Sequence, residues 1–154
     1  MQKIIIIVLV VLLLIYLSTK LFINKSSPPK TINQNIKDQS YILEIANNSY
    51  LQAKGLSNRS ELCSNCGMLF VFNGETIRYF WMKDTLISLD MIFVTQSGQV
   101  TDIFTAKPEP NVPDLQLKLY QSSQAVKYVI ELNAGTAQKI KLKIGDSIKI
   151  NYGN

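Results

Sequence analysis

Two cysteines separated by two residues, Cys63 and Cys66, form the sharpest chemical motif of this 154-residue chain. Three roles fit the spacing: a structural disulfide, a redox-active thiol pair, or half of a metal site. A redox pair usually precedes a helix whose N-terminus lowers the thiol pKa, but here Gly67 and an apolar, strand-like run follow. Structural zinc takes about four ligands, and two cysteines without any histidine cannot supply them within one chain. We therefore predict a Cys63–Cys66 disulfide and no metal site, with the redox role as the next alternative.

Polar and aromatic side chains also gather where one predicted strand ends and the next begins. Lysine and aspartate at such a place can bind a polar ligand, an indole can stack on it, and a carboxylate can act as a general base if burial raises its pKa. The structural alternative is a turn held by side-chain hydrogen bonds, with the last aspartate paired to a basic residue. No residue is assigned a catalytic role. The candidate ligand pocket contains Trp81, Lys83, Asp84, Thr85, Asp90 and Arg59.

Arg59, together with Glu131 and Asn133, forms a weaker set, in which Glu131 belongs to an alternating stretch, residues 126–132, and Asn133 follows it. Alternation places Glu131 on the same strand face as Val129 and Lys127, because successive side chains of a strand point to opposite sides. We therefore expect Glu131 to face solvent or to form a salt bridge, and not to act in catalysis.

Composition removes several classes of function. The absence of histidine excludes Ser-His-Asp and Cys-His catalysis. Residues 1–38 carry five lysines and one aspartate, whereas residues 39–154 carry eleven basic and ten acidic residues. A nucleic-acid binder concentrates basic residues on its folded domain, so we expect no nucleic-acid partner. The chain has no Gly-x-Gly-x-x-Gly or P-loop motif, and we predict no cofactor; a protein partner or small polar ligand stays unidentified.

The N-terminal segment is apolar enough to enter a membrane. Residues 4–17 are apolar without a break, and extension to residue 23 gives the length of about twenty residues that a spanning helix needs. A cleaved signal peptide would be followed by small residues of the A-x-A type, which are absent here. We predict residues 1–23 as a membrane anchor or signal sequence, with an uncleaved anchor favoured and residues 4–23 in contact with the membrane.

The orientation of this segment rests on conflicting signals. Lys3 precedes the apolar run and three lysines follow it, which by the positive-inside rule argues for a cytoplasmic domain. A very short charged segment directly before an apolar run is instead typical of export signals. We expect a single-pass protein of the cytoplasmic membrane with its domain outside, periplasmic or extracellular.

The remaining chain divides into a linker and one domain. Residues 24–38, which include Pro28 and Pro29, predict a flexible linker, and residues 39–154 a compact β domain. Short apolar runs separated by turn residues predict a small antiparallel β-sandwich or partly closed barrel with two short helices, behind an N-terminal transmembrane helix. One helix is expected at 50–54, with Asn48 as its cap and Gly55 as its end, and another at 136–141, with Asn133 as its cap. A long loop is expected at 107–123. Strands are expected at 41–46, 68–72, 77–82, 89–95, 100–106, 126–132 and 147–152, the second and third joined by an Asn73-Gly74 hairpin turn.

Three blocks of the chain resemble motifs of the domain-of-unknown-function 192 family, also known as uncharacterised protein family 0127. They are residues 55–72 with Gly-Leu-Ser-Asn-Arg-Ser-Glu-Leu and Gly-Met-Leu-Phe-Val-Phe, residues 80–90 with Phe-Trp-Met-Lys-Asp-Thr-Leu, and residues 128–146 with Tyr-Val-Ile-Glu-Leu-Asn-Ala-Gly-Thr-Ala. The resemblance covers about residues 40–150 and implies a mainly β domain, often behind a signal peptide or anchor. It brings no agreed activity or catalytic residues. The chain departs from the family pattern at Cys63, Cys66, Asp84 and Ser88.

These observations predict a membrane-tethered, extracytoplasmic β domain that acts as a non-catalytic binding or accessory module. One alternative is an envelope enzyme that acts on a polar substrate through the cluster from Trp81 to Asp90. Another is a thiol–disulfide protein that uses Cys63 and Cys66. The sequence leaves open whether the protein is an enzyme.

Overall fold

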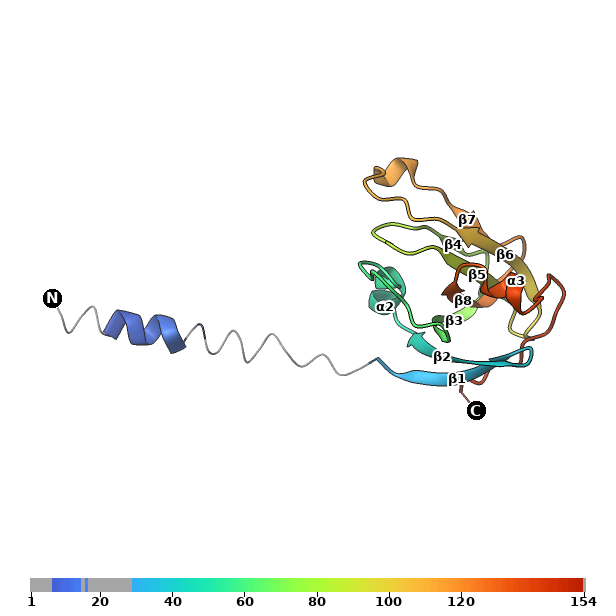
Figure 1. Ribbon diagram of the computed structural model, residues 1–154, viewed down its shortest axis with the longest axis horizontal. Helices are drawn as coiled ribbons and strands as arrows, with labels where there is room; N and C mark the ends of the chain where they lie inside the picture. The colour runs from blue at the N-terminus through green and yellow to red at the C-terminus, as the bar shows by residue number, and fades with distance from the viewer. Residues whose placement is uncertain (1–6, 15, 17–28, 154) are drawn as a thin grey trace.

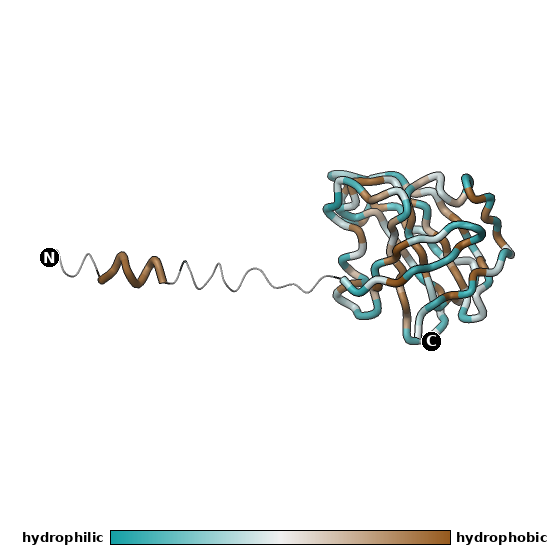
Figure 2. The backbone as a smooth tube through the Cα atoms, turned by 60° about the horizontal axis from the view of Figure 1, so that its bottom comes forward, coloured by the Kyte–Doolittle hydropathy of each residue, from teal (hydrophilic) through white to brown (hydrophobic). Residues whose placement is uncertain are grey.

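The computed structural model describes residues 7–14, 16 and 29–153 (Figure 1). Residues 7–14 and 16 are helical, and residues 7–14 are apolar (Figure 2). Within the described parts of the chain, no helix combines the length and the hydropathy of a membrane span. Much of the predicted anchor at 1–23 and of the predicted linker at 24–38 falls on positions 1–6, 15 and 17–28, which lie outside the described residues.

The domain is built on one mixed sheet with a small second sheet beside it. In the main sheet, β2 and β3 run parallel and every other neighbouring pair is antiparallel. Its strands in spatial order are β1 (Thr31–Ile36), β2 (Gln39–Ala46), β3 (Cys66–Thr76), β8 (Val126–Asn133), β5 (Leu89–Val94) and β6 (Val100–Ala106). The second sheet pairs β4 (Tyr79–Phe80) with β7 (Tyr120–Gln121). The short helices are α2 (Ser49–Lys54), the 3-10 helix η1 (Asp114–Gln116) and α3 (Thr136–Lys139).

Helix α2 lies in the crossover that allows β2 and β3 to run parallel, because parallel neighbours need a long connection. Asn48 caps the helix by accepting a hydrogen bond from the backbone N–H of Leu51 at 2.9 Å. Gly55 ends it with a positive φ of 47°, a conformation that glycine adopts without steric cost. The helix predicted at 50–54, with this cap and this stop, is confirmed.

Both faces of the main sheet are buried. On one face, Leu69, Ile92 and Ile130 pack against Ala137 of α3 and against Leu142 in the C-terminal segment; we call it the α3 face. On the other, Phe70, Met91, Phe93 and Val129 pack against Leu56, Met82, Phe80 and Tyr120, with Leu51 of α2 at the margin; we call it the α2 face. Hydrophobic stretches accordingly run through the middle of the domain in Figure 2. This double burial explains why β5 is buried at all its positions.

The predicted antiparallel sandwich or partly closed barrel is corrected to an open, mixed sheet. In the described residues the sheet runs from β1 to β6 without pairing these two edges, so it does not close. Three short helices, counting η1, replace the two that were expected. The predicted loop at 107–123 contains η1 and β7. Helix α3 begins after Gly135, which adopts a positive φ of 83°, and Asn133 belongs to β8.

The predicted hairpin through Asn73-Gly74 is wrong. Strand β3 continues through both residues to Thr76, and Tyr79–Phe80 pairs with β7 instead. The two long edges of β3 are already taken by β2 and β8, which leaves no place for a returning strand. Asn73 and Gly74 lie where the register of β3 with β8 shifts between Val71 and Thr76, so the turn signal marks a bulge in a continuing strand.

The two ends of the domain also differ from expectation. The predicted linker extends too far, because residues 31–36 form β1 and Ile36 is fully buried against the α3 face. The predicted last strand at 147–152 is absent, apart from one bridge between Ser147 and Gln99. Gln34 of β1 holds this segment instead, since its side-chain amide donates to the Lys149 carbonyl at 2.9 Å and accepts from the Asn151 N–H at 2.9 Å. The Gln34 side chain, together with the backbone hydrogen bond from the Ile148 N–H to the Gly98 carbonyl at 2.8 Å, therefore replaces the expected strand ladder.

Candidate functional site

A pocket of about 230 Å³ opens on the α2 face. Residues 52–56, at the end of α2, form one wall together with Phe70 and Phe72 of β3. Strand β4 and the loop after it form the other wall, with Tyr79, Phe80 and Trp81. We call this cavity the aromatic pocket.

The aromatic rings of the pocket pack against one another. The ring centroid of Phe80 lies 4.9 Å from that of Phe70, 6.4 Å from that of Phe72 and 5.6 Å from that of Phe93, all edge to face. Such perpendicular pairs are favourable because the positive ring edge meets the negative ring face. The guanidinium of Arg78 lies 3.9 Å from the centroid of Phe72, and Arg78 donates to the Gly74 carbonyl at 2.8 Å. The walls are therefore fixed by the fold, before any ligand binds.

Glu131 lies at the base of the aromatic pocket, on β8 in the centre of the sheet. It is level with Met68 of β3 and Met91 of β5, and its residue is only 5% exposed. The carboxyl forms no hydrogen bond or ion pair with any residue that the structure describes. Burial among apolar groups raises the pKa of Glu131 to about 8, because the low dielectric disfavours the charged form.

The expectation that Glu131 faces solvent or forms a salt bridge is therefore wrong. Alternation along residues 126–132 correctly separates two faces of the strand, but both faces of β8 are covered. On a central strand the second face is a second core, so a charged residue there is buried.

The rim of the pocket carries basic residues and the single tryptophan. Trp81 is 51% exposed. Lys83 forms an ion pair with Asp114 at 2.5 Å, and this hydrogen bond raises the pKa of Lys83. Lys54 is exposed in the last turn of α2. The charge of the pocket is therefore negative at its base, when Glu131 ionises, and positive at its mouth.

The candidate ligand pocket predicted from the sequence is assembled only in part. Trp81, Lys83 and Thr85 line the aromatic pocket, with Thr85 buried and donating to the Lys83 carbonyl at 3.2 Å. Asp84 does not line it: its side chain is exposed and borders a separate shallow cleft. Asp84 adopts a positive φ of 53°, and its backbone carbonyl accepts a hydrogen bond from the Asn58 N–H at 2.7 Å.

Asp90 lies on the opposite side of the sheet, where it is 1% exposed. One carboxylate oxygen accepts from the Thr105 hydroxyl at 2.7 Å, and the other accepts from the backbone N–H of Ala137 at 2.8 Å. Both oxygens are therefore used to attach α3 and β6 to β5. The expected general base at Asp90 is replaced by a structural carboxylate, since alternation along β5 turns Asp90 away from Met91 and the pocket.

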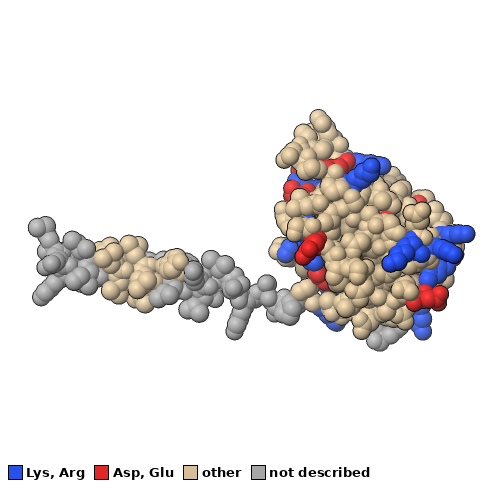
Figure 3. All heavy atoms as spheres, viewed as in Figure 1, with Lys and Arg blue, Asp and Glu red and all other residues tan. Residues whose placement is uncertain are grey.

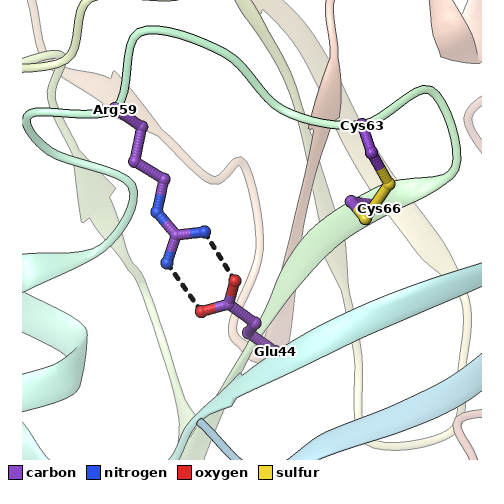
Figure 4. A network of polar contacts seen from close by, with 4 residues as sticks. All are labelled: Glu44, Arg59, Cys63 and Cys66. Atoms are coloured by element: carbon purple, nitrogen blue, oxygen red, sulfur yellow. Dashed lines mark hydrogen bonds and ion pairs between the residues drawn. A yellow bond between two sulfur atoms is a disulfide. The ribbon is translucent and has the colours of Figure 1, made fainter. Parts of the chain in front are cut away.

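Arg59 is also outside the aromatic pocket. It forms a two-pronged ion pair with Glu44 of β2, at 2.5 and 2.6 Å (Figure 4), and its hydrogen bond to Glu44 raises the pKa of Arg59. Bidentate arginine–carboxylate pairs fix orientation as well as charge. Arg59 therefore positions the segment between α2 and β3, which begins with the pocket residues Gly55 and Leu56.

Cys63 and Cys66 form a disulfide in the same segment (Figure 4). The backbone N–H of Cys66 donates to the Cys63 carbonyl at 3.0 Å, and the Asn133 side chain donates to that carbonyl at 2.9 Å. Cys66 begins β3, so no helix N-terminus follows the pair. The disulfide and Asn133 thus attach the segment to β3 and to the end of β8.

Other charged residues gather away from the aromatic pocket. Basic side chains cover the end of the domain near α3 and the β1–β2 turn (Figure 3). Lys37, Lys139 and Lys141 line a groove there, and Lys37 forms an ion pair with Asp146 at 2.8 Å. Among the described residues, no group of three acidic or cysteine side chains could hold a metal ion.

Sequence reasoning misplaced Glu131 at the surface or in a salt bridge and missed the phenylalanines of the pocket. A signal for Glu131 was present, because Val126, Tyr128, Val129, Ile130 and Leu132 surround it with apolar side chains on both strand faces. Such a run indicates a strand buried on both sides. The role of Phe80 carried no comparable signal, since it depends on the pairing of β4 with β7.

Comparison with known proteins identifies relatives over the whole domain. A family model named DUF192 and described as an uncharacterized ACR matches residues 30–150. A UPF0127 protein of Pyrococcus abyssi (strain GE5 / Orsay) is 30% identical over 113 residues, which are 70% of this chain and 84% of the relative.

Two crystal structures have a similar fold. One is a protein of Sinorhizobium meliloti 1021 described as a candidate transcription regulator, with a TM-score of 0.69 and 27% identity over 82% of this chain and 96% of that chain. The other is a protein of unknown function from Novosphingobium aromaticivorans DSM 12444, with a TM-score of 0.66 and 28% identity over 81% of this chain and 94% of that chain.

Proposed function

We propose that the domain of this chain, which belongs to the DUF192 family, also named UPF0127, binds a small organic ligand in the aromatic pocket, without a reaction of its own. The observation that carries this proposal is the Glu131 carboxyl, which is buried at the base of the pocket and has no partner among the described residues. Its oxygens open onto the cavity, since among the described residues the fully buried side-chain atom without a hydrogen bond is Arg78 Nε. A carboxyl in so apolar a cavity is poorly hydrated, which costs free energy. A ligand that donates hydrogen bonds to the carboxyl removes this penalty in the complex, and its binding is favoured by the same amount.

The three blocks that resemble the family converge on this pocket. The first contributes Gly55, Leu56, Phe70 and Phe72, the second Phe80, Trp81, Lys83 and Thr85, and the third Glu131. These blocks are far apart in the chain and share no single structural element. Their meeting at one cavity supports a role of the cavity itself in the function of the domain.

The chemistry of the lining favours binding over catalysis. Ligand pockets are mostly apolar, with a few polar groups that fix orientation, and here five aromatic residues surround one acid. Among the described lining residues, Glu131 is the acidic one, and none is a cysteine or a histidine. Asp90, the base of the alternative enzyme, lies on the other side of the sheet with both oxygens engaged. The thiol–disulfide alternative lacks the helix N-terminus that activates a redox pair.

We further propose that residues 4–23 anchor the protein in the cytoplasmic membrane, with the domain outside. The uninterrupted apolar run at residues 4–17 supports the anchor. The Cys63–Cys66 disulfide supports the orientation, because disulfides persist in oxidising compartments and are rare in the cytoplasm. The domain would then present the aromatic pocket to ligands of the cell envelope.

Fluorescence of Trp81 tests ligand binding, since it is the single tryptophan of the chain and lines the pocket. Titration of the full-length chain with benzyl alcohol, a small neutral aromatic probe, is expected to give a saturable change. Ala53→Phe places a ring in the pocket mouth and should weaken binding at least tenfold. Ala125→Phe makes the same change at an exposed alanine outside the pocket and should leave binding unchanged. Equal binding by Ala53→Phe and the wild type would overturn the proposal, as would the absence of saturation with benzyl alcohol and with its charged analogues benzylamine and benzoate alike.

Membrane fractionation tests the tether. The full-length chain should stay in the membrane pellet after extraction with alkaline carbonate, and external protease should digest its domain once the outer face of the cytoplasmic membrane is exposed. Release by carbonate would contradict the anchor, and protection from protease would contradict the orientation.

A further inference from the structure

We propose that the ligand of the aromatic pocket is a small organic cation, an amine with an apolar body, whose ammonium group pairs with Glu131. This inference rests on the proposed function and specifies the chemical class of the ligand. It follows from the base of the pocket, its walls, its mouth and its size.

The base requires a ligand that brings hydrogen-bond donors. No described residue donates to the Glu131 carboxyl, and its neighbours in register are the thioethers of Met68 and Met91. A buried carboxylate is stable only when it is paired and hydrogen-bonded. An ammonium group supplies both the opposite charge and up to three N–H donors.

The walls suit a positive charge. Aromatic ring faces attract cations through their quadrupole, and the attraction grows when the cation is removed from water. Phe70, Phe72, Phe80 and Trp81 offer such rings around Glu131. The wall residue Phe72 already makes a cation–π contact with the guanidinium of Arg78, which lies 3.9 Å from the ring centroid.

The mouth selects the orientation of the ligand. The charged residues that line it are Lys54 on α2 and Lys83 after β4, and Lys83 is paired with Asp114. Tyr79 on β4 is the other titratable lining residue, and β3 contributes only Phe70 and Phe72. Asp114 and Asp84 offset the charge of Lys83, so Lys54 is the residue that disfavours an ammonium group at the mouth. The Glu131 carboxyl at the base is left as the site of the ammonium group. The apolar body of the ligand then lies between the rings.

The size of the pocket limits the ligand to a small molecule. A volume of about 230 Å³ corresponds to about eight water molecules at about 30 Å³ each. Benzylamine, with one ring and one ammonium group, fills a space of this order. Benzyl alcohol and benzoate offer the same ring with a neutral and a negative group.

Cation binding is coupled to the release of a proton. Burial holds the pKa of Glu131 at about 8, so the carboxyl is protonated in the empty pocket at neutral pH. When the ammonium group enters, the carboxyl proton leaves to solvent and the carboxylate pairs with the cation. Affinity should therefore rise about tenfold per pH unit below pH 8 and level off above it. The benzylammonium group, which is more acidic than a lysine ammonium group, stays mostly protonated up to about pH 9. A neutral ligand that accepts a hydrogen bond from the protonated carboxyl would show the opposite trend.

The test is a Trp81 fluorescence titration of the full-length chain with benzylamine, benzyl alcohol and benzoate at pH 6.5, 7.5 and 8.5. We expect benzylamine to bind at least tenfold more tightly than the other two probes at pH 8.5. Its affinity should increase about tenfold from pH 6.5 to 7.5. Glu131→Gln should weaken benzylamine binding at least tenfold and leave benzyl alcohol binding intact, which also shows that the variant is folded. Glu61→Gln, the same change at an exposed site outside the pocket, should bind like the wild type.

The outcomes separate this inference from the proposed function. If benzyl alcohol binds and benzylamine binds no better, or if Glu131→Gln binds benzylamine as the wild type does, the cation inference is overturned and the pocket remains a binding site. If benzylamine affinity falls as pH rises toward 8, the cation inference is also overturned. If none of the three probes saturates, both proposals fail.

Discussion

The central sheet buries two carboxyl groups on opposite faces. They differ in their hydrogen-bond partners and in the space beside them. Asp90, on the α3 face, accepts hydrogen bonds from Thr105 and from the Ala137 N–H. Glu131, on the α2 face, has no partner among the described residues and borders a cavity. Burial with partners indicates a structural group, and burial without partners beside a cavity indicates a binding group. The residue that the sequence placed in a ligand pocket is the structural one.

The packing around the two groups differs in the same way. On the α3 face, a Cβ added to Gly67 would lie 2.4 Å from the Glu131 carbonyl oxygen and 2.8 Å from a methyl group of Leu43. On the α2 face, the pocket leaves about 230 Å³ unfilled. One face is therefore packed without room for a methyl group, whereas the other keeps room for a small molecule.

The largest expected effect comes from filling the tight face. Gly67→Ala should destabilise the protein by about 4 kcal/mol or more, because the methyl group collides with backbone atoms that cannot move aside. Urea unfolding of the purified full-length chain measures the change. Ala53→Phe at the pocket mouth should change stability by less than about 1 kcal/mol. Equal losses in the two variants would contradict the contrast in packing.

Removal of the partnered carboxyl is the next largest effect. Asp90→Ala should destabilise by about 3 kcal/mol, because it leaves the buried Ala137 N–H and the Thr105 hydroxyl without acceptors. The exposed Asp38 gives a matched control, and Asp38→Ala should stay within about 0.5 kcal/mol of the wild type. A neutral effect of Asp90→Ala would show that the attachment of α3 does not depend on this carboxylate.

Removal of the Glu131 carboxyl, which has no partner among the described residues, should increase the free energy of unfolding at high pH, whereas removal of the Asp90 carboxyl should decrease it. The pKa of Glu131 is about 8 in the folded chain and about 4.5 without burial, so the folded state binds more protons between these values and stability falls as pH rises. At about 1.4 kcal/mol per pKa unit, this loss has a ceiling of about 5 kcal/mol. Glu131→Gln should therefore gain about 2 kcal/mol or more at pH 9 and less than about 0.5 kcal/mol at pH 4, where the carboxyl is mostly protonated in both states. Destabilisation at pH 9 would show that the carboxyl has a stabilising partner.

The smallest of these effects concerns the segment that forms one wall of the pocket. Replacing both cysteines, Cys63→Ser with Cys66→Ser, should cost up to about 2 kcal/mol, the chain-entropy value for so short a loop. Asn133 and the Arg59–Glu44 pair still hold the segment, so Trp81 titrations with benzyl alcohol should change less than threefold. Complete loss of probe binding would assign the disulfide a role in shaping the pocket.

The sequence predicted local structure better than it predicted contacts between distant segments. Helix α2 followed from Asn48 and Gly55, because capping depends on a few neighbouring residues. The predicted Asn73-Gly74 turn was wrong because strand pairing, which depends on distant segments, continues β3 through these residues as a bulge. Likewise Gln34 of β1 is buried by the C-terminal segment, and no local pattern indicates that contact.

For the candidate site too, local groupings were predicted better than contacts between distant segments. Trp81, Lys83 and Thr85 were found because they are neighbours in sequence on one side of the pocket. Asp90 was grouped with them by proximity in sequence, but strand alternation turns it to the other face. The burial of Glu131 was not predicted, because it depends on which segments cover the second face of β8.

The pKa of Glu131 tests the central claim most directly. The side-chain carboxyl carbon of Glu131 can be followed by carbon-13 NMR from pH 4 to 10, with Glu131→Gln to assign the signal. We predict a midpoint near 8 in the empty protein and a clearly lower midpoint with saturating benzylamine, because the cation stabilises the carboxylate. A midpoint near 4.5 in the empty protein would contradict the claim that Glu131 is buried without a partner. A midpoint that benzylamine leaves unchanged would contradict the claim that Glu131 binds the cationic ligand.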